Sequence, residues 1–115
     1  MNIGVDIVEI ERIKNLIETK ENFLQRLFSP EEIKYCNQKK LKEQNFAARF
    51  AAKEAVIKAL NDKSIPLNSI SIQNEKSGKP VVKLSGKWKK FEEKISISLS
   101  HSDKYAVAFI IYKEG

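Results

Sequence analysis

Two carboxylates in apolar surroundings are the residues of this sequence whose types and settings could support chemistry. Asp6 interrupts the strand-like run Ile3–Val8, although aspartate is a poor strand former. Glu54 lies in the alanine-rich run Phe46–Leu60 and would stand about 40° around a helix from Phe50. A desolvated carboxylate is costly unless a cation or strong donors meet it. Two carboxylates with no soft ligand suit a hard cation such as Mg²⁺, so we expect Asp6 and Glu54 to share one.

Each of these carboxylates also has a structural explanation. Asp6 could cap the helix that follows the strand. Glu54 could pair with Lys58, which lies one helical turn further along the same side. A shared cation explains both unusual positions with one assumption, and we therefore prefer it.

A third polar group follows a segment in which serine and apolar residues alternate, residues 95–100. His101, the only histidine, comes directly after this segment. Together with the neighbouring serines it could hydrogen-bond phosphate oxygens, or it could simply cap a turn. The Ser-Gly-Lys-Pro turn at residues 77–80 also resembles an anion-receiving loop.

The charge balance suits an anionic partner. The chain has 21 Lys and Arg residues against 15 Asp and Glu, a net charge of +6. This surplus favours nucleic acid, anionic lipid, a phosphorylated cofactor or an acidic protein without choosing among them. The sequence has no zinc-type Cys/His cluster, P-loop, dinucleotide-binding glycine motif or nucleophile elbow, which excludes those kinds of site.

The cysteine content and hydropathy bear on the compartment. Cys36 is the only cysteine, which excludes an intramolecular disulfide and fits a reducing environment. No apolar run approaches membrane-spanning length, and the N-terminus lacks the basic-then-apolar pattern of a signal peptide. We expect a cytoplasmic protein that makes no membrane contact.

Two elements must position the carboxylates. Residues 3–8 are predicted as a strand with apolar side chains on both faces, and therefore as a central strand. Gly4, on the same face as Asp6, would let a helix or a ligand approach closely. Residues 46–60 are predicted as a long helix, apolar on most of its circumference, which belongs in an interior or an interface.

The remaining segments complete an α+β pattern. Ser29, Pro30 and Glu32 form a capping box that begins a short helix ending near Asn37. Other predicted elements are a helix from Glu9 with the apolar stripe Ile10, Ile13, Leu16 and Ile17, strands at 70–73 and 81–84, a short helix at 88–94, and a hairpin of strands 95–100 and 105–112. We expect one small α+β domain, residues 1–115, with a mainly antiparallel sheet packed on the long helix.

Four motifs, in order along essentially the whole chain, resemble those of one enzyme family. They are Gly4–Val8, Arg49–Ala55 followed by Lys58–Ala59, Gly78–Pro80 and Ser96–Ser102. The sequence is similar to the holo-acyl-carrier-protein synthase type of 4′-phosphopantetheinyl transferase. The combination of Asp6 with Arg-Phe-Ala-Ala-Lys-Glu-Ala is the specific part of the resemblance.

The resemblance implies an activity, ligands and an assembly. The implied reaction moves 4′-phosphopantetheine from coenzyme A to a serine of apo-acyl carrier protein, releases adenosine 3′,5′-bisphosphate and supports fatty acid biosynthesis. The implied magnesium ligands are Asp6 and Glu54, and family members are homotrimers with active sites between subunits. The implied coenzyme A contacts are Arg49, Phe50, Lys53, Lys58, Gly78, Lys79, Pro80, Ser100 and His101.

The catalytic roles follow from displacement at phosphorus, which needs charge neutralisation and in-line positioning. Lys58 could neutralise or protonate the leaving phosphate. The acceptor of the serine proton is Glu54, a metal-bound water or His101, and the sequence does not decide among them.

Carrier proteins are strongly acidic, so the basic surplus has a candidate target. We expect the docking face on the first helix and just beyond it, with Arg12, Lys14, Lys20 and Arg26. Relatives often carry more arginines near the end of this helix, where this chain has Thr19 and Asn22. The alternative is that these residues form an ordinary basic surface.

Two rival functions can be compared with this one. A nucleic-acid-binding module would need a basic groove with exposed aromatic residues, whereas the basic residues here are dispersed and most aromatics occupy predicted core positions. A relative that binds coenzyme A or carrier protein without turnover is the second rival. The intact set of Asp6, Glu54 and Lys58 argues against it.

Overall fold

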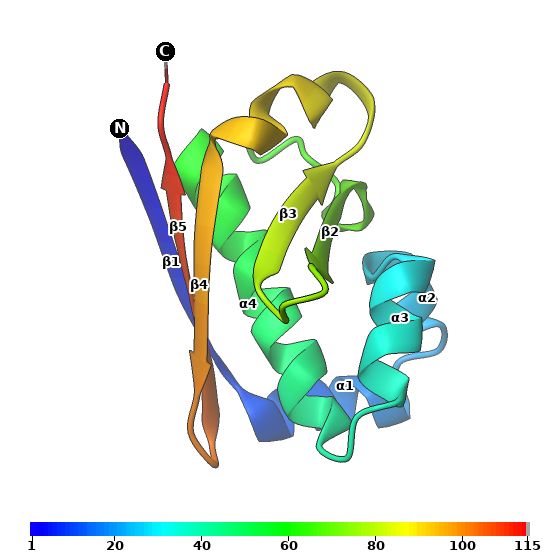
Figure 1. Ribbon diagram of the computed structural model, residues 1–115. Helices are drawn as coiled ribbons and strands as arrows, with labels where there is room; N and C mark the ends of the chain where they lie inside the picture. The colour runs from blue at the N-terminus through cyan, green and yellow to red at the C-terminus, as the bar shows by residue number, and fades with distance from the viewer. Residues whose placement is uncertain (115) are drawn as a thin grey trace.

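The computed structural model describes residues 1–114 and arranges them around one long helix, α4 (Lys42–Leu60). Figure 1 shows α4 between a three-stranded sheet on one side and a two-stranded ribbon with shorter helices on the other. Alanine positions on α4 such as Ala47, Ala51 and Ala55 are fully buried, so neighbouring backbones approach it closely from several directions. The predicted interior helix is confirmed, and it begins four residues earlier than expected.

The larger sheet is antiparallel, with the strand order β1-β5-β4. Its strands are β1 (Asn2–Glu9), β5 (Tyr105–Tyr112) and β4 (Ile95–His101). The prediction that the first strand is central was wrong, because β1 is an edge strand. Apolar residues on both faces normally indicate two buried faces. Here one face packs on α4, and the other, with Ile3, Val5 and Ile7, is exposed in the single chain.

Gly4 sets the contact between β1 and α4. A Cβ atom at this position would lie 1.9 Å from the carbonyl oxygen of Ala55, far inside van der Waals contact. The strand therefore lies directly on the helix backbone, as the sequence predicted for a glycine at this place. Asp6, two residues further on, shares the face of β1 that is turned toward α4.

The second sheet is the hairpin of β2 (Ile70–Asn74) and β3 (Pro80–Leu84). A short 3₁₀ helix, η1 (Leu67–Ser69), precedes it. The segment predicted as a short helix at 88–94 is a 3₁₀ helix, η2 (Gly86–Lys94). In η2, Trp88 Nε1 donates to Asp62 Oδ2 at 3.1 Å, and Phe91 packs edge-on against Tyr112 with ring centroids 5.8 Å apart.

Three short helices connect β1 to α4: α1 (Ile10–Thr19), α2 (Phe23–Leu27) and α3 (Pro30–Asn37). The capping box of α3 is confirmed, since Ser29 Oγ accepts from the Glu32 amide and Glu32 Oε1 accepts from the Ser29 amide. The α+β class with antiparallel pairing is also confirmed, with two sheets rather than one. No helix within residues 1–114 is both long and apolar enough to cross a membrane.

Candidate active site

The first group of site residues lies where β1 crosses α4. Lys58 Nζ lies 3.0 Å from Asp6 Oδ1 and 3.1 Å from the carbonyl oxygen of Val5. The Asp6 side chain is 19% exposed and that of Lys58 55%, so the pair is open to a ligand. Within residues 1–114 Lys58 forms its ion pair with Asp6 and not with Glu54, the partner that helical spacing suggested.

Glu54 belongs to the same group because its charge interacts with that of Asp6. Burial raises the pKa of Glu54, the nearby Asp6 carboxylate raises it further, and the cations Lys58 and Arg12 oppose both effects. Two acidic side chains that are distant along the chain therefore share one electrostatic environment. We call this group, Asp6, Glu54 and Lys58, the acidic group.

The chemistry of the acidic group fits a hard cation. Among the residues that the structure describes, no cluster of three or more His, Cys, Asp or Glu side chains could enclose a metal. Magnesium does not require one, since it binds through one or two carboxylates and completes its octahedron with waters and phosphate oxygens. Asp6 and Glu54 are such a pair, and the raised pKa of Glu54 is a cost that a cation would relieve.

The second group lines a groove of about 320 Å³ between α4, the β2–β3 hairpin and β4. Its walls include Tyr35, Arg49, Asn74, Gly78, Pro80 and His101. We call this cavity the hairpin groove. The lining combines a guanidinium, an imidazole and a glycine-containing turn.

Arg49 is the principal charge of the hairpin groove. It is only 2% exposed, its Nη2 donates to Asn74 Oδ1 at 2.5 Å, and its guanidinium lies over the Tyr35 ring, 4.4 Å from the ring centroid. Its Nε has no hydrogen-bond partner, and no acidic side chain in the described part of the chain pairs with it. A guanidinium that lines a groove and has no acidic partner is well suited to bind an anion.

Five of the implied coenzyme A contacts do not line this groove: Phe50, Lys53, Lys58, Lys79 and Ser100. Lys53 is fully buried and forms an ion pair with Glu32 at 2.7 Å, so direct contact with a ligand is incompatible with its position. Phe50 is 8% exposed and packs on Phe23. Ser100 is exposed on β4, whose alternation turns it away from the face that carries His101.

The two groups are separated within one chain. Arg49 and Glu54 point about 140° apart around α4, since successive residues are 100° apart. Asp6 is on β1 and His101 is on β4, at opposite edges of the sheet with β5 between them. Lys79 is exposed at the tip of the hairpin.

The basic residues expected to bind the carrier protein lie at three separate places. Arg12 lies beside the acidic group, with its guanidinium 5.9 Å from the centroid of the Phe50 ring. Lys20 and Arg26 flank a separate cavity of about 220 Å³, and Lys14 borders another near the start of α4.

Sequence reasoning missed Tyr35, Asn74 and the buried partner of Lys53. Glu32 was assigned only to the capping box, and nothing in its local sequence shows that its second oxygen binds the amide of Ile72 at 2.9 Å. Tyr35 and Asn74 each approach Arg49 from elements that are remote in sequence.

Comparisons with known proteins identify the family of the chain and its fold. A family model for the 4′-phosphopantetheinyl transferase superfamily matches residues 2–110. The holo-[acyl-carrier-protein] synthase of Thermodesulfovibrio yellowstonii is 46% identical, with 95% of each chain covered. The holo-[acyl-carrier-protein] synthase of Ruminiclostridium cellulolyticum is 44% identical, with 100% of this chain and 93% of that protein covered. The crystal structure of the Helicobacter pylori holo-[acyl-carrier-protein] synthase in complex with coenzyme A has a TM-score of 0.82 at 34% identity, covering 96% of this chain and 99% of that one.

With this fold and an acidic pair at the β1–α4 contact, the chain belongs to the 4′-phosphopantetheinyl transferase superfamily. Within this enzyme superfamily it is similar to the holo-[acyl-carrier-protein] synthases over its whole length. The resemblance that the four sequence motifs indicated is thereby confirmed.

Proposed function

We propose that the protein transfers 4′-phosphopantetheine from coenzyme A to a serine of apo-acyl carrier protein and releases adenosine 3′,5′-bisphosphate. The observation that carries this proposal is the convergence of Asp6 and Glu54, with Lys58, where β1 crosses α4. The full-length similarity to holo-[acyl-carrier-protein] synthases supports the acceptor, and the relatives crystallised with coenzyme A support the donor. We place the reaction in the cytoplasm and in fatty acid biosynthesis, as the family resemblance implies.

Asp6 and Glu54 would hold Mg²⁺. The bound ion would neutralise charge on the diphosphate of the donor. Lys58, whose ammonium lies beside the Asp6 carboxylate, would neutralise or protonate the departing phosphate. The proton of the acceptor serine can pass to Glu54, whose raised pKa brings it closer to the working pH, or to His101.

The hairpin groove would hold the nucleotide part of the donor. Arg49 supplies a cation with no acidic partner among residues 1–114, and Gly78, Pro80 and His101 also line the groove. Lys79 at the hairpin tip could add a second positive charge. Anion binding through a buried arginine is favourable because the charge is already desolvated.

A homotrimer would join the two groups of residues. The outer face of the larger sheet exposes an apolar patch that a single soluble chain rarely leaves open: Ile3, Val5, Ile7, Tyr105 and Phe109. A second copy packed on this face could bring its hairpin groove, at the β4 edge, to the acidic group at the β1 edge. Such a contact joins different surfaces of the two copies, and a threefold rotation would close three of these contacts into a ring.

The acidic carrier would dock beside the acidic group. Arg12 is the best placed of the expected basic residues, since it lies close enough to Glu54 to affect its pKa. Lys20 and Arg26, further along, would extend the positive surface, with Lys14 on its border.

A mass-shift assay tests the proposed function. Purified protein with Mg²⁺ and coenzyme A should add about 340 Da, the mass of the transferred group, to an apo-acyl carrier protein. A carrier whose modified serine is replaced by alanine is the matched control and should keep its mass. An unchanged mass of the intact carrier over a long incubation would reject the proposal.

A further inference from the structure

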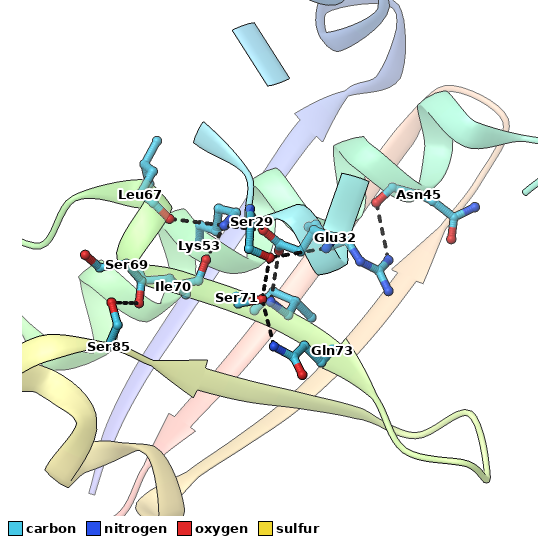
Figure 2. A network of polar contacts seen from close by, with 12 residues as sticks. Ser29, Glu32, Asn45, Lys53, Leu67, Ser69, Ile70, Ser71, Gln73 and Ser85 are labelled. Atoms are coloured by element: carbon cyan, nitrogen blue, oxygen red, sulfur yellow. Dashed lines mark hydrogen bonds and ion pairs between the residues drawn. The ribbon is translucent and has the colours of Figure 1, made fainter. Parts of the chain in front are cut away.

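Figure 2 shows a network of polar contacts that includes a buried ion pair between Lys53 and Glu32. Lys53 Nζ is 2.7 Å from Glu32 Oε1, and both side chains are 0% exposed. The same ammonium donates to the carbonyl oxygen of Leu67 at 3.1 Å and to that of Ile70. An ammonium has three donors, so every hydrogen bond that Lys53 can make is made inside the protein.

The carboxylate of this pair is equally occupied. Glu32 Oε1 accepts from the Ser29 amide, and Oε2 accepts from the Ile72 amide, each at 2.9 Å. The pair therefore joins three elements: the start of α3, the middle of α4 and the first half of β2. Exchanging a buried ion pair for well-packed apolar residues often costs no stability, so stability alone does not explain its presence.

The geometry indicates what the pair holds in place. At its beginning, β2 is bound to α4 through Lys53 and Ile70. At its end, β2 is bound to α4 through Arg49, which donates to Asn74 Oδ1, while Asn74 Nδ2 donates to the carbonyl oxygen of Gly78 at 2.9 Å. Two residues one helical turn apart on α4 thus fix both ends of the strand whose hairpin forms a wall of the groove.

We propose that Lys53 is a positioning residue for the donor: with Glu32 it fixes the β2–β3 hairpin over the groove and so sets the affinity for coenzyme A. This rests on the proposed function, because it takes coenzyme A as the occupant of the groove. Lys53 itself touches no ligand. Its effect passes through the hairpin, so it should change coenzyme A binding and leave the carrier-binding surface on α1 unchanged.

The test variant replaces both charges at once. Lys53→Met alone would leave a buried unpaired carboxylate and could prevent folding. Glu32→Gln/Lys53→Met removes both charges at similar volume, and its glutamine oxygen can still accept from the Ser29 amide. Ile110→Val, a buried change on β5 away from the hairpin, is the matched control for mild loss of packing.

We expect the double variant to fold, with KM and the calorimetric Kd for coenzyme A raised at least tenfold and with kcat and the carrier KM within twofold of wild type. Amide exchange in β2 should also be faster than in Ile110→Val. If the double variant does not fold, Glu32→Gln/Lys53→Gln, which also removes both charges and keeps an amide donor near the carbonyl oxygens of Leu67 and Ile70, serves as the test, with an expected rise of threefold or more.

The proposal would be overturned if a folded variant binds coenzyme A like the wild type, or if kcat falls while the coenzyme A KM is unchanged. Failure of the proposed function looks different, because then the wild type itself neither binds coenzyme A nor modifies the carrier.

Discussion

At the scale of single residues, the site depends on charges that the fold keeps in unfavourable surroundings. Glu54 is partly buried next to another carboxylate, and Arg49 is buried without an acidic partner. Both arrangements cost stability in the absence of a ligand, and both become favourable when an opposite charge binds. Functional sites commonly concentrate such groups.

Replacing Glu54 by glutamine should stabilise the protein and stop the reaction. The pKa of Glu54 is higher in the folded than in the unfolded protein, so the folded state holds that proton more tightly. Its contribution to stability is thus most favourable at acid pH and is lost as the pH rises through the folded pKa. At pH 7 without metal, Glu54→Gln should raise Tm by a few degrees, at about 3–6 °C per kcal/mol for this size, and lower kcat/KM at least ~100-fold.

Calorimetry at pH 5 and pH 8 in a chelating buffer measures the stability effect, which should be larger at pH 8. The charges that act on residue 54 are the same in the wild type and in Glu54→Gln: Asp6, Lys58 and Arg12. The difference in Tm between these two proteins therefore reports the effect of the Glu54 carboxylate. Glu18→Gln, an exposed change on α1, is the control and should leave Tm and activity unaltered. A lower Tm for Glu54→Gln would show that the carboxylate stabilises the fold.

Reversing the charge of Arg12 should separate the two substrates. Arg12→Glu removes a cation next to the acidic group and introduces a charge that repels an acidic carrier. We expect the carrier KM to rise at least ~10-fold, with a weaker dependence of kcat/KM on salt, while the coenzyme A KM changes less than ~3-fold. Equal increases in both KM values, measured by steady-state kinetics, would contradict the docking assignment.

At the scale of elements, one helix directs several functional side chains to different places. Arg49 points to the hairpin groove, Lys53 points into the interior, where it pairs with Glu32, and Glu54 points toward β1. Steps of 100° per residue produce this divergence without any break in the helix. The position of α4 against its neighbours therefore decides the geometry of the whole site.

The contact of β1 with α4 gives the sharpest element-level prediction. Gly4→Ala would place a Cβ 1.9 Å from a backbone oxygen that cannot move aside, so β1 must shift off the helix. We expect a loss of about 3 kcal/mol, seen as a much lower Tm, and reduced activity because Asp6 moves with the strand.

Gly86→Ala is the control for this change, since its added Cβ meets nothing closer than 3.9 Å. Its cost should be limited to the strain of a positive φ, about 1–2 kcal/mol. Chemical denaturation of both variants measures the difference. A Gly4→Ala protein as stable as Gly86→Ala would contradict the close packing of β1 on α4.

At the scale of the whole molecule, the proposed ring explains two features that a single chain leaves unexplained. One is the apolar outer face of the larger sheet, and the other is the separation of the acidic group from the hairpin groove. A second copy of the chain would cover the apolar outer face. It would also bring a hairpin groove to the acidic group of its neighbour. The copies would meet through this outer face, so that the β4 edge of one copy comes near the β1 edge of the next.

Mixing two inactive variants tests the shared site. Asp6→Asn removes one carboxylate of the acidic group, and Arg49→Met removes the cation of the hairpin groove. If each site takes one group from each neighbour, an equal mixture re-formed from monomers should regain about a quarter of wild-type activity, because a quarter of interfaces combine two intact halves. No recovery in trimers shown by native mass spectrometry to contain both variants would place the complete site in one chain.

The local elements and the acidic pair could be predicted from the sequence alone. The capping box at Ser29, the periodicity of α4 and the β4–β5 hairpin depend on residues that are close together in the chain. Asp6 and Glu54 stood out because each is a carboxylate in an apolar run, and such a position carries a cost wherever the chain folds.

Only the tertiary structure decided which face of β1 is covered and where each cation of α4 goes. Ile3, Val5 and Ile7 look like core residues, yet they are exposed because no element within residues 1–114 covers the outer face of the larger sheet. Lys53 lies in the Arg49–Ala55 motif, whose family resemblance implies a coenzyme A contact, yet it is buried and pairs with Glu32. Local sequence cannot decide these cases, because burial and ion pairing depend on partners that only chain folding, or a second chain, brings into contact.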